Sequence, residues 1–217
     1  FMAYAYEHFG LGMAYYIDLD KLACDFARQK LGLKNIIHGN VCHLSSIIDK
    51  KFDFIYCRHV IEHVVDPTEM ITHMINLLKD GGLIELILPN GISLEYLGYS
   101  KLLKNRYEKI MASNPGWSKR KAWRVLSSSK IAHGIDPIRH LWAISPHGIA
   151  EWLKSIPDIC FQISTATLND PIYSMYYAHN LKKRWQDRLR VRIVNQSFAK
   201  IHGGCHLVVR IQKQSHQ

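Results

Sequence analysis

The sequence has 217 residues, of which 47% are hydrophobic and 21% are charged, and its net charge at pH 7 is +10. This composition is that of a soluble globular protein and excludes the disordered and fibrous classes, and no apolar run reaches the ~18 residues of a membrane span. The five cysteines are scattered and never form C-x-x-C, which argues against a disulfide framework or a zinc cluster. We therefore expect a reducing, cytoplasmic location.

Helical and strand-like patterns alternate from the start of the chain. We expect a helix over 2–9, a strand over 15–18, a helix over about 20–31 and a strand in "KNIIHGN". Asp20 should cap the second helix, because its carboxylate can accept a bond from a first-turn amide. The apolar residues of that helix should form one buried face made of Leu22, Ala23, Phe26, Ala27 and Leu31.

The same rhythm continues to Asn90. The run "FDFIYC" predicts a strand buried on both faces, and a helix should begin at Pro67 with Asp66 as its N-cap and end at "KDGG". The run "LIELILPN" predicts another strand. Strands that alternate with helices in this way indicate an α/β fold with a parallel sheet.

Beyond Asn90 the pattern changes. Residues from about 91 to 137 resemble a basic helical insert, rich in Trp and Tyr and interrupted at "NPGWS". A helix should follow from Pro146 with Ser145 as its cap, and "DICFQISTATL" and "GGCHLVVRIQK" predict two strands. The basic residues concentrate after Ser100, which indicates either a solvated basic face or an anionic partner.

Polar residues follow three of the predicted strands, namely Asp18, Gly39-Asn40 and Cys57-Arg58-His59. In an open parallel sheet, ligands bind outside the carboxyl ends of the strands. An acid after one strand can bind both hydroxyls of a ribose, and an amide after the next can reach an adenine amino group. Taken alone, Asp18 is equally a capping acid and Asn40 an ordinary turn residue.

The longer stretch "KFDFIYCRHVIEHVVDPTEMITHMINLLKDGGLIELILPN" resembles class I S-adenosylmethionine-dependent methyltransferases, in particular ubiquinone-pathway O-methyltransferases of the small-molecule branch. The matching positions are Phe52-Asp53, Ile61-Glu62-His63, Asp66-Pro67, Leu78-Lys79-Asp80-Gly81-Gly82 and Pro89-Asn90. "YIDLDKLACDFA" and "RHLWAISPHGIAEWL" are similar to further segments of that family. The resemblance covers residues 2–90 well and 136–160 loosely.

This resemblance implies a Rossmann-like, mostly parallel sheet with an antiparallel C-terminal strand. It implies one domain over residues 1–217, with a core of 1–90 and 138–217 and a helical insert over about 91–137. S-adenosylmethionine is the implied cofactor. The residues implied to bind it are Asp18, Leu19, Asn40, Val41, Cys57, Arg58 and His59. The sequence departs from the family at Asn40, where an acid is usual.

The glycine loop of the family lies between its first strand and first helix, upstream of the matching region. We therefore expect the sequence to be a fragment that lacks this strand and loop, or to receive the strand in another way. In the family this strand lies at the centre of the sheet, between the second and fourth strands. Its removal would split the sheet and expose two apolar edges, which is an aggregation hazard.

The motif "HVIEH" at residues 59–63 has two further interpretations. H-x-x-E-H is an inverted zinc-peptidase signature, but that site requires a long helix, and His59 follows a strand. Some similar methyltransferases hold a divalent ion with E-x-x-E-H. Here His59 replaces the first acid, and because Mg²⁺ prefers oxygen ligands, this replacement disfavours a magnesium site. We expect no metal, and we expect Glu62 and His63 to brace the turn by hydrogen bonds.

The implied reaction is an in-line methyl transfer in which the protein mainly aligns the reacting atoms. His59 and, second, His140 are candidate general bases, although a histidine is commonly structural. The aromatic residues Tyr96, Tyr99, Tyr107, Trp117 and Trp123 either line an acceptor pocket or pack a helical cap. The acceptor is expected to be a small molecule, lipid or glycan precursor, and the basic insert permits contact with an anionic lipid or polyanion. No nucleic-acid-binding module is recognised.

Two other function classes compete with this one. The first is an inactive or truncated methyltransferase-like binding domain, which the absent glycine loop and Asn40 favour. The second is a nicotinamide-dependent oxidoreductase, which shares the acid after a strand. We rank the oxidoreductase last, because such enzymes show neither the "EH-DP" segment nor a final strand entered from "GG".

Overall fold

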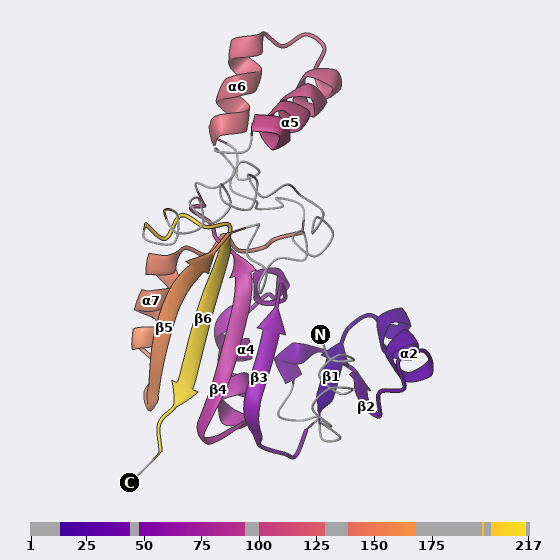
Figure 1. Ribbon diagram of the computed structural model, residues 1–217, viewed down its shortest axis with the longest axis vertical. Coiled ribbons are helices and arrows are strands. Elements are labelled where there is room, and N and C mark those ends of the chain that lie inside the picture. The colour runs from indigo at the N-terminus through magenta and orange to yellow at the C-terminus, as the bar shows by residue number, and fades with distance from the viewer. Residues whose placement is uncertain are drawn as a thin grey trace, which may run out of the picture. The chain divides into compact units, whose positions relative to one another are not determined.

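A computed structural model describes residues 14–43, 48–93, 100–128, 139–167, 197 and 201–215 (Figure 1). The chain divides into two compact units, which we call unit 1 (Phe1–Lys51 and Asp66–Leu77) and unit 2 (Phe52–Val65 and Leu78–Gln217). The helix expected over 2–9 and the aromatic residues Tyr96 and Tyr99 lie outside the described residues. None of the described helices has the length and apolar character needed to cross a membrane.

Unit 1 contains a parallel pair of strands, β1 (Tyr15–Asp18) and β2 (Asn35–His38), joined by helix α2 (Lys21–Gln29). Asp20 caps α2, as predicted, by accepting a hydrogen bond from the Leu22 N–H. The core of this part consists of Cys24, Ala27, Leu33 and Ile36, with Tyr16 packed against it.

The predicted buried face of α2 is confirmed at Ala27 but wrong at its large residues. Leu22 is 78% exposed and Phe26 57% exposed, whereas Cys24 and Ala27 are buried. Residues three apart lie on the same side of a helix, and the side that packs against β1 and β2 carries these small residues. The larger apolar residues lie on another side, which periodicity alone could not distinguish.

Unit 1 also contains the short 3-10 helix η1 (Val41–His43) and helix α4 (Pro67–Asn76). Asp66 caps α4 as predicted, because its carboxylate accepts hydrogen bonds from the Thr68 and Glu69 N–H groups. Four apolar residues of α4 are buried, namely Met70, Ile71, Met74 and Ile75.

Unit 2 is built on a four-stranded sheet with the order β3-β4-β6-β5. The strands are β3 (Phe52–Arg58), β4 (Leu78–Pro89), β5 (Ile159–Ala166) and β6 (His206–Lys213). Strand β3 runs parallel to β4, while β6 runs antiparallel to both of its neighbours, so its arrow points the opposite way in Figure 1. The prediction of an α/β fold with an antiparallel C-terminal strand is therefore confirmed.

The prediction that β3 is buried on both faces is wrong. Cys57 is its only buried residue, and Phe54 is 46% exposed. The reason is its position, because β3 is an edge strand that pairs with β4 alone among the described strands. The described strands form two sheets rather than one.

Strand β4 begins earlier than predicted, at Leu78, so that "KDGG" belongs to the strand instead of ending the preceding helix. The pairing with β3 shifts register between Phe52 and Phe54. Gly81 adopts a φ of 76°, which is a left-handed conformation that favours glycine. The glycines thus allow an irregular start to the strand.

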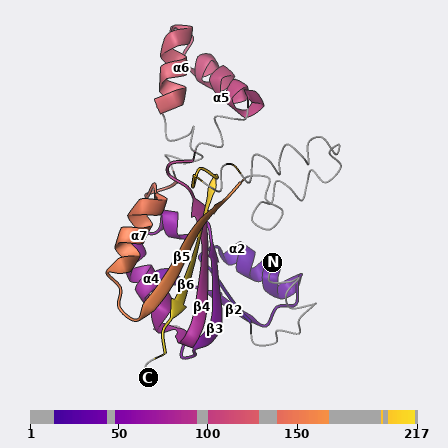
Figure 2. The ribbon, with the colours of Figure 1, turned by 60° about the vertical axis from the view of Figure 1, so that its left-hand side comes forward.

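Three α-helices belong to the described part of unit 2. Helices α5 (Ser100–Ser113) and α6 (Lys119–Ser128) lie within the predicted insert, and the predicted break at "NPGWS" separates them. Helix α7 (Pro146–Lys154) is capped by Ser145, as predicted, and lies beside β5 on one face of the sheet (Figure 2).

Candidate functional site

Four of the residues implied to bind the cofactor lie at one edge of unit 1, at the carboxyl ends of β1 and β2. Asp18 ends β1 and lies opposite His38 at the end of β2. The Gly39 N–H donates to the Asp18 carbonyl oxygen at 3.0 Å, which holds the two strand ends together. Asp18 and Leu19 therefore lie beside Asn40 and Val41, although 22 positions separate Asp18 from Asn40.

The carboxylate of Asp18 is held by two hydrogen bonds. Its Oδ1 accepts from the Asp20 N–H at 2.9 Å, and its Oδ2 accepts from the Tyr16 hydroxyl. Burial, followed by the bond to Asp18, holds the pKa of Tyr16 well above its usual value, so the hydroxyl remains a donor. A carboxylate has about four lone-pair sites, so these two bonds leave acceptor capacity for a pair of ligand hydroxyls.

Asn40 shapes the turn that follows β2. Its side-chain oxygen accepts from the Cys42 N–H at 2.9 Å, and its carbonyl oxygen accepts from the His43 N–H at 3.0 Å. An amide oxygen has a second lone pair, which is the acceptor that an adenine amino group would require.

The other three residues implied to bind the cofactor end strand β3 in unit 2. Burial raises the pKa of the Cys57 thiol to about 12, so the thiol stays neutral. Arg58 is the last residue of the strand and pairs with Ile87. His59 has a φ of 51°, and its N–H donates to the Ile87 carbonyl oxygen at 2.8 Å. A left-handed conformation in a non-glycine residue costs about 1–2 kcal/mol.

A buried carboxylate lies next to His59. Glu62, in the 3-10 helix η2 (Ile61–His63), is 1% exposed, and its Oε1 lies 3.2 Å from His59 Nδ1. Its Oε2 has no hydrogen-bond partner in the described part of the chain. The motif "HVIEH" pointed to this residue, but only as a brace of the turn. Because η2 is three residues long, the helix required for a zinc-peptidase site is not present at residues 59–63.

The second predicted base, His140, lies beside the same short helix. Its ring makes an edge contact with the ring of His63 at 4.9 Å, and the Leu141 N–H donates to the Glu62 carbonyl oxygen at 2.8 Å. His63 Nδ1 lies 2.8 Å from the Arg139 carbonyl oxygen. Potential ligand atoms of Glu62, His63 and His140 lie within 4.8 Å of one another, close enough to converge on one cation.

His206, at the start of β6, was not predicted as a site residue. Its ring lies edge-on to His59 at 5.4 Å. Burial is the main cause that lowers the pKa of His206 to about 3, and the neighbouring His59 and Arg58 lower it further. The imidazole of His206 is therefore neutral near pH 7. A single histidine before the apolar run "LVVRI" gives no sequence signal for this contact.

A family model described as a methyltransferase domain matches residues 20–156, which is more than half of the chain. The chain belongs to this methyltransferase family. As the sequence motifs implied, it is a class I enzyme whose methyl donor is S-adenosylmethionine. This membership decides against the nicotinamide-dependent oxidoreductase. The particular similarity to ubiquinone-pathway enzymes stays an expectation.

Solved structures of the plantazolicin methyltransferase BpumL share its fold. The plantazolicin methyltransferase BpumL in complex with a triazolic desmethylPZN analog and SAH is 16% identical over 99% of this chain and 72% of that chain, with a TM-score of 0.51. BpumL in complex with SAH gives the same TM-score and identity, with 71% of that chain covered. The plantazolicin methyltransferase BamL is 19% identical over 92% of this chain and 67% of that chain, with a TM-score of 0.48. A search of curated proteins gives no match.

Proposed function

We propose that this methyltransferase transfers the methyl group of S-adenosylmethionine to a small-molecule acceptor and that Asp18 binds the ribose of the cofactor. The observation that carries the assignment of Asp18 is its carboxylate at the end of β1, oriented by Tyr16 and Asp20. The small-molecule acceptor is favoured by the neighbour BpumL, which was crystallised with a desmethylPZN analog. Asn40 and Val41, at the same edge of unit 1, are proposed to contact the adenine.

The residues of β3 have separate proposed roles. S-adenosylmethionine supplies an electrophilic methyl group. A lone pair of the acceptor forms a bond to the methyl carbon while the carbon–sulfur bond breaks and its electron pair passes to sulfur. The proton of the acceptor then goes to a base, and we assign this role to His59. His140 contacts His63 instead, which makes it the weaker candidate. Cys57 and Arg58 are proposed to line the cofactor, and the neutral thiol excludes Cys57 as a nucleophile.

Calorimetric titration of S-adenosylhomocysteine tests the cofactor assignment. Asp18→Asn keeps an oxygen that can accept from Asp20 but removes the charge. Because hydrogen bonds to charged groups contribute about 1.5–3 kcal/mol, we expect binding to weaken about 10- to 100-fold. Asp25→Asn is the control, since Asp25 makes exposed ion pairs with Lys21 and Arg28 on helix α2.

Either of two results would contradict the proposal. A folded protein that does not bind S-adenosylhomocysteine would refute the cofactor assignment for this chain and favour the binding-domain alternative. Equal affinity of the wild type and Asp18→Asn would refute the role of Asp18 alone.

We further propose that the hairpin of α5 and α6 contacts an anionic lipid surface. The hairpin is held by Ala122 and Leu126, which are fully buried, and by the stacked rings of Tyr107 and Trp123 at 5.2 Å. This stacking accounts for two of the aromatic residues of the insert as packing.

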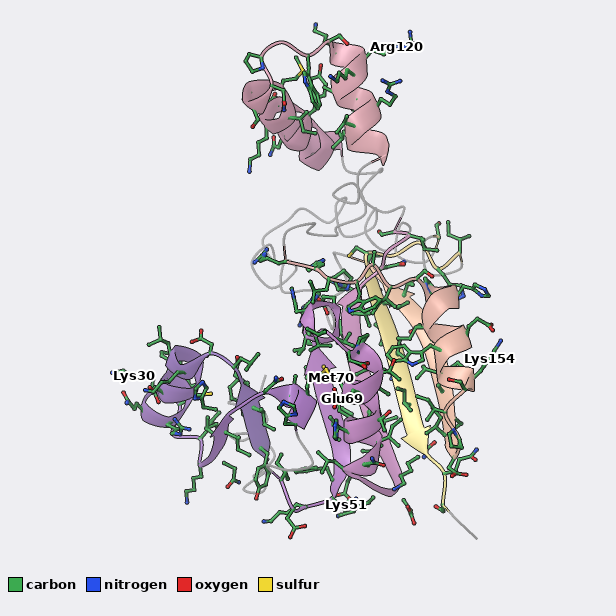
Figure 3. All side chains as sticks on the ribbon, turned by 180° about the vertical axis from the view of Figure 1, so that it is seen from behind. Lys30, Lys51, Glu69, Met70, Arg120 and Lys154 are labelled. Carbon is green, nitrogen blue, oxygen red and sulfur yellow. The ribbon has the colours of Figure 1, made fainter. Side chains whose placement is uncertain are left out.

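The outer side of α6 supports this proposal through its charge. Helix α6 contains no acidic residue, and its first turn carries exposed Lys119, Arg120 and Lys121. Arg120 projects away from the helix (Figure 3), and Lys121 lies over the ring of Trp117 at 4.3 Å. Basic side chains beside partly exposed aromatic rings suit the headgroup region of an anionic membrane.

A further inference from the structure

We propose that Glu62 is a positioning residue, whose buried carboxylate holds His59 in the tautomer that leaves its Nε2 able to accept a proton. This inference rests on the proposed role of His59 as the base. It adds a residue to which the sequence assigned only a bracing role.

The backbone fixes the place of His59 first. Its N–H donates to Ile87 on the neighbouring strand β4, and its left-handed φ turns the chain sharply out of β3 into η2. Such a conformation in a histidine is costly, and strained residues of this kind concentrate at functional sites. The turn brings Glu62, three positions later, back toward the His59 ring.

The chemistry of Glu62 then determines the tautomer of His59. A buried carboxylate needs hydrogen-bond donors, because it has lost its hydration. An ionised carboxylate only accepts, so the contact of 3.2 Å between Oε1 and His59 Nδ1 requires the proton to be on Nδ1. A neutral ring with its proton on Nδ1 has its lone pair on Nε2, which is the atom a general base uses.

His63 does not donate a hydrogen bond to Glu62 in place of His59. Its Nε2 lies 3.8 Å from Glu62 Oε1, which is beyond hydrogen-bond distance. Its Nδ1 lies 2.8 Å from the Arg139 carbonyl oxygen, which only accepts, so Nδ1 of His63 is a donor to that carbonyl. Of these two histidines, His59 is therefore the one that donates to Glu62.

The surroundings of His59 suit this role. The ring of His206 covers it edge-on from β6 and stays neutral near pH 7, so it adds no positive charge. The side chain of His59 is 36% exposed, so a small acceptor can reach it. A carboxylate that orients an imidazole in this way also stabilises the imidazolium that forms when the base takes a proton.

The tautomer of His59 can be measured directly by ¹⁵N NMR of the histidine rings at pH 8, where neutral rings predominate. The signals of His59 are identified by their loss in His59→Gln. We expect wild-type His59 to carry its proton on Nδ1. In Glu62→Ala the ring should shift toward the Nε2-protonated form that free imidazole favours. Glu62→Asp should cause part of this shift. Glu69→Ala is the control, because it removes a carboxylate 3.6 Å from His73 and should leave the tautomer of His59 unchanged.

Three results would overturn the inference. The first is a wild-type ring protonated on Nε2, which needs no variant to fold. The second is a folded Glu62→Ala with the wild-type spectrum. The third is a change of the His59 signals on adding EDTA, which would mean that a cation at Glu62, His63 and His140 positions the ring.

Calorimetry with S-adenosylhomocysteine separates this inference from the proposed function. Glu62→Ala should bind within about twofold of the wild type, since positioning a base does not hold the cofactor. A protein that binds no S-adenosylhomocysteine would refute the proposed function but leave the tautomer result intact.

Discussion

At the scale of single residues, Asn90 joins the end of β4 to the distant segment before β6. Its side chain is fully buried and donates to the carbonyl oxygens of His202 and Gly204 at 2.9 and 2.8 Å. Its oxygen accepts from the Ile92 N–H. The motif "PN" marked Asn90 by resemblance, but the two carbonyl groups to which it donates could not be read from the sequence because they lie more than a hundred positions away.

We predict that Asn90→Ala lowers the free energy of unfolding by about 3 kcal/mol, because it removes three hydrogen bonds and leaves the buried Gly204 carbonyl without this donor. Urea denaturation measures this change. Asn114→Ala is the control, since Asn114 donates to the Ile110 carbonyl within α5, and it should cost less than about 1.5 kcal/mol. Equal losses would contradict the importance of the buried carbonyls.

His206 gives a prediction about pH. Its pKa is lowered to about 3 in the folded protein, so below about pH 6.5 the unfolded chain takes up a proton that the folded protein does not. The free energy of unfolding should therefore fall as the pH falls from about 6.5, by at most about 1.4 kcal/mol per pH unit from this group.

His206→Phe keeps a planar ring but removes the titration. We expect urea denaturation between pH 7 and 5 to show a weaker loss of stability for this variant than for the wild type. His147→Leu is the control, because it also removes one histidine, but one that is 86% exposed. Parallel pH profiles of the wild type and His206→Phe would contradict the buried, neutral histidine.

At the scale of elements, local signals predicted where helices begin and long-range packing decided what they bury. Asp20, Asp66 and Ser145 were each recognised as caps, because a cap bonds amides two or three residues away. The buried face of α2 and the exposure of β3 were predicted wrongly. Both depend on which other strands are adjacent, and the periodicity of one segment does not contain that information.

The hairpin of α5 and α6 supplies the prediction at this scale. Reversing two charges with Lys119→Glu and Arg120→Glu should weaken binding to vesicles of phosphatidylcholine and phosphatidylserine at least about tenfold, since each basic residue near such a surface contributes about 1 kcal/mol. Cosedimentation measures this binding. Lys30→Glu with Lys34→Glu is the matched control, because it makes the same charge change in unit 1 and should have little effect.

Two results would contradict the lipid proposal. Equal losses in both double variants would show that net charge alone, rather than the hairpin, attracts the vesicles. Binding to a soluble polyanion such as heparin without binding to vesicles would favour a polyanionic partner instead.

At the scale of the whole molecule, the described strands form two separate sheets, and β3 is an edge of the larger one. An unprotected edge with an exposed aromatic side chain can pair with another chain. Phe54 is such a side chain.

We predict that Phe54→Lys reduces concentration-dependent association in light scattering, because a lysine on an edge strand opposes pairing. Val65→Lys is the control, since Val65 is an exposed apolar residue outside the strands. An equal reduction in both variants would indicate a general effect of charge or lost apolar surface rather than edge pairing.

The sequence by itself determined the family, the alternation of strands and helices, their caps, and the acid that ends β1. These features depend on short-range order, in which the relevant residues lie within a few positions of one another. Only the tertiary structure decided that His140 lies against His63, that His206 covers His59 and that Glu62 is buried beside His59. The two contacts between histidine rings join segments far apart in the chain, so they depend on how the strands pair and how the loops cross their ends.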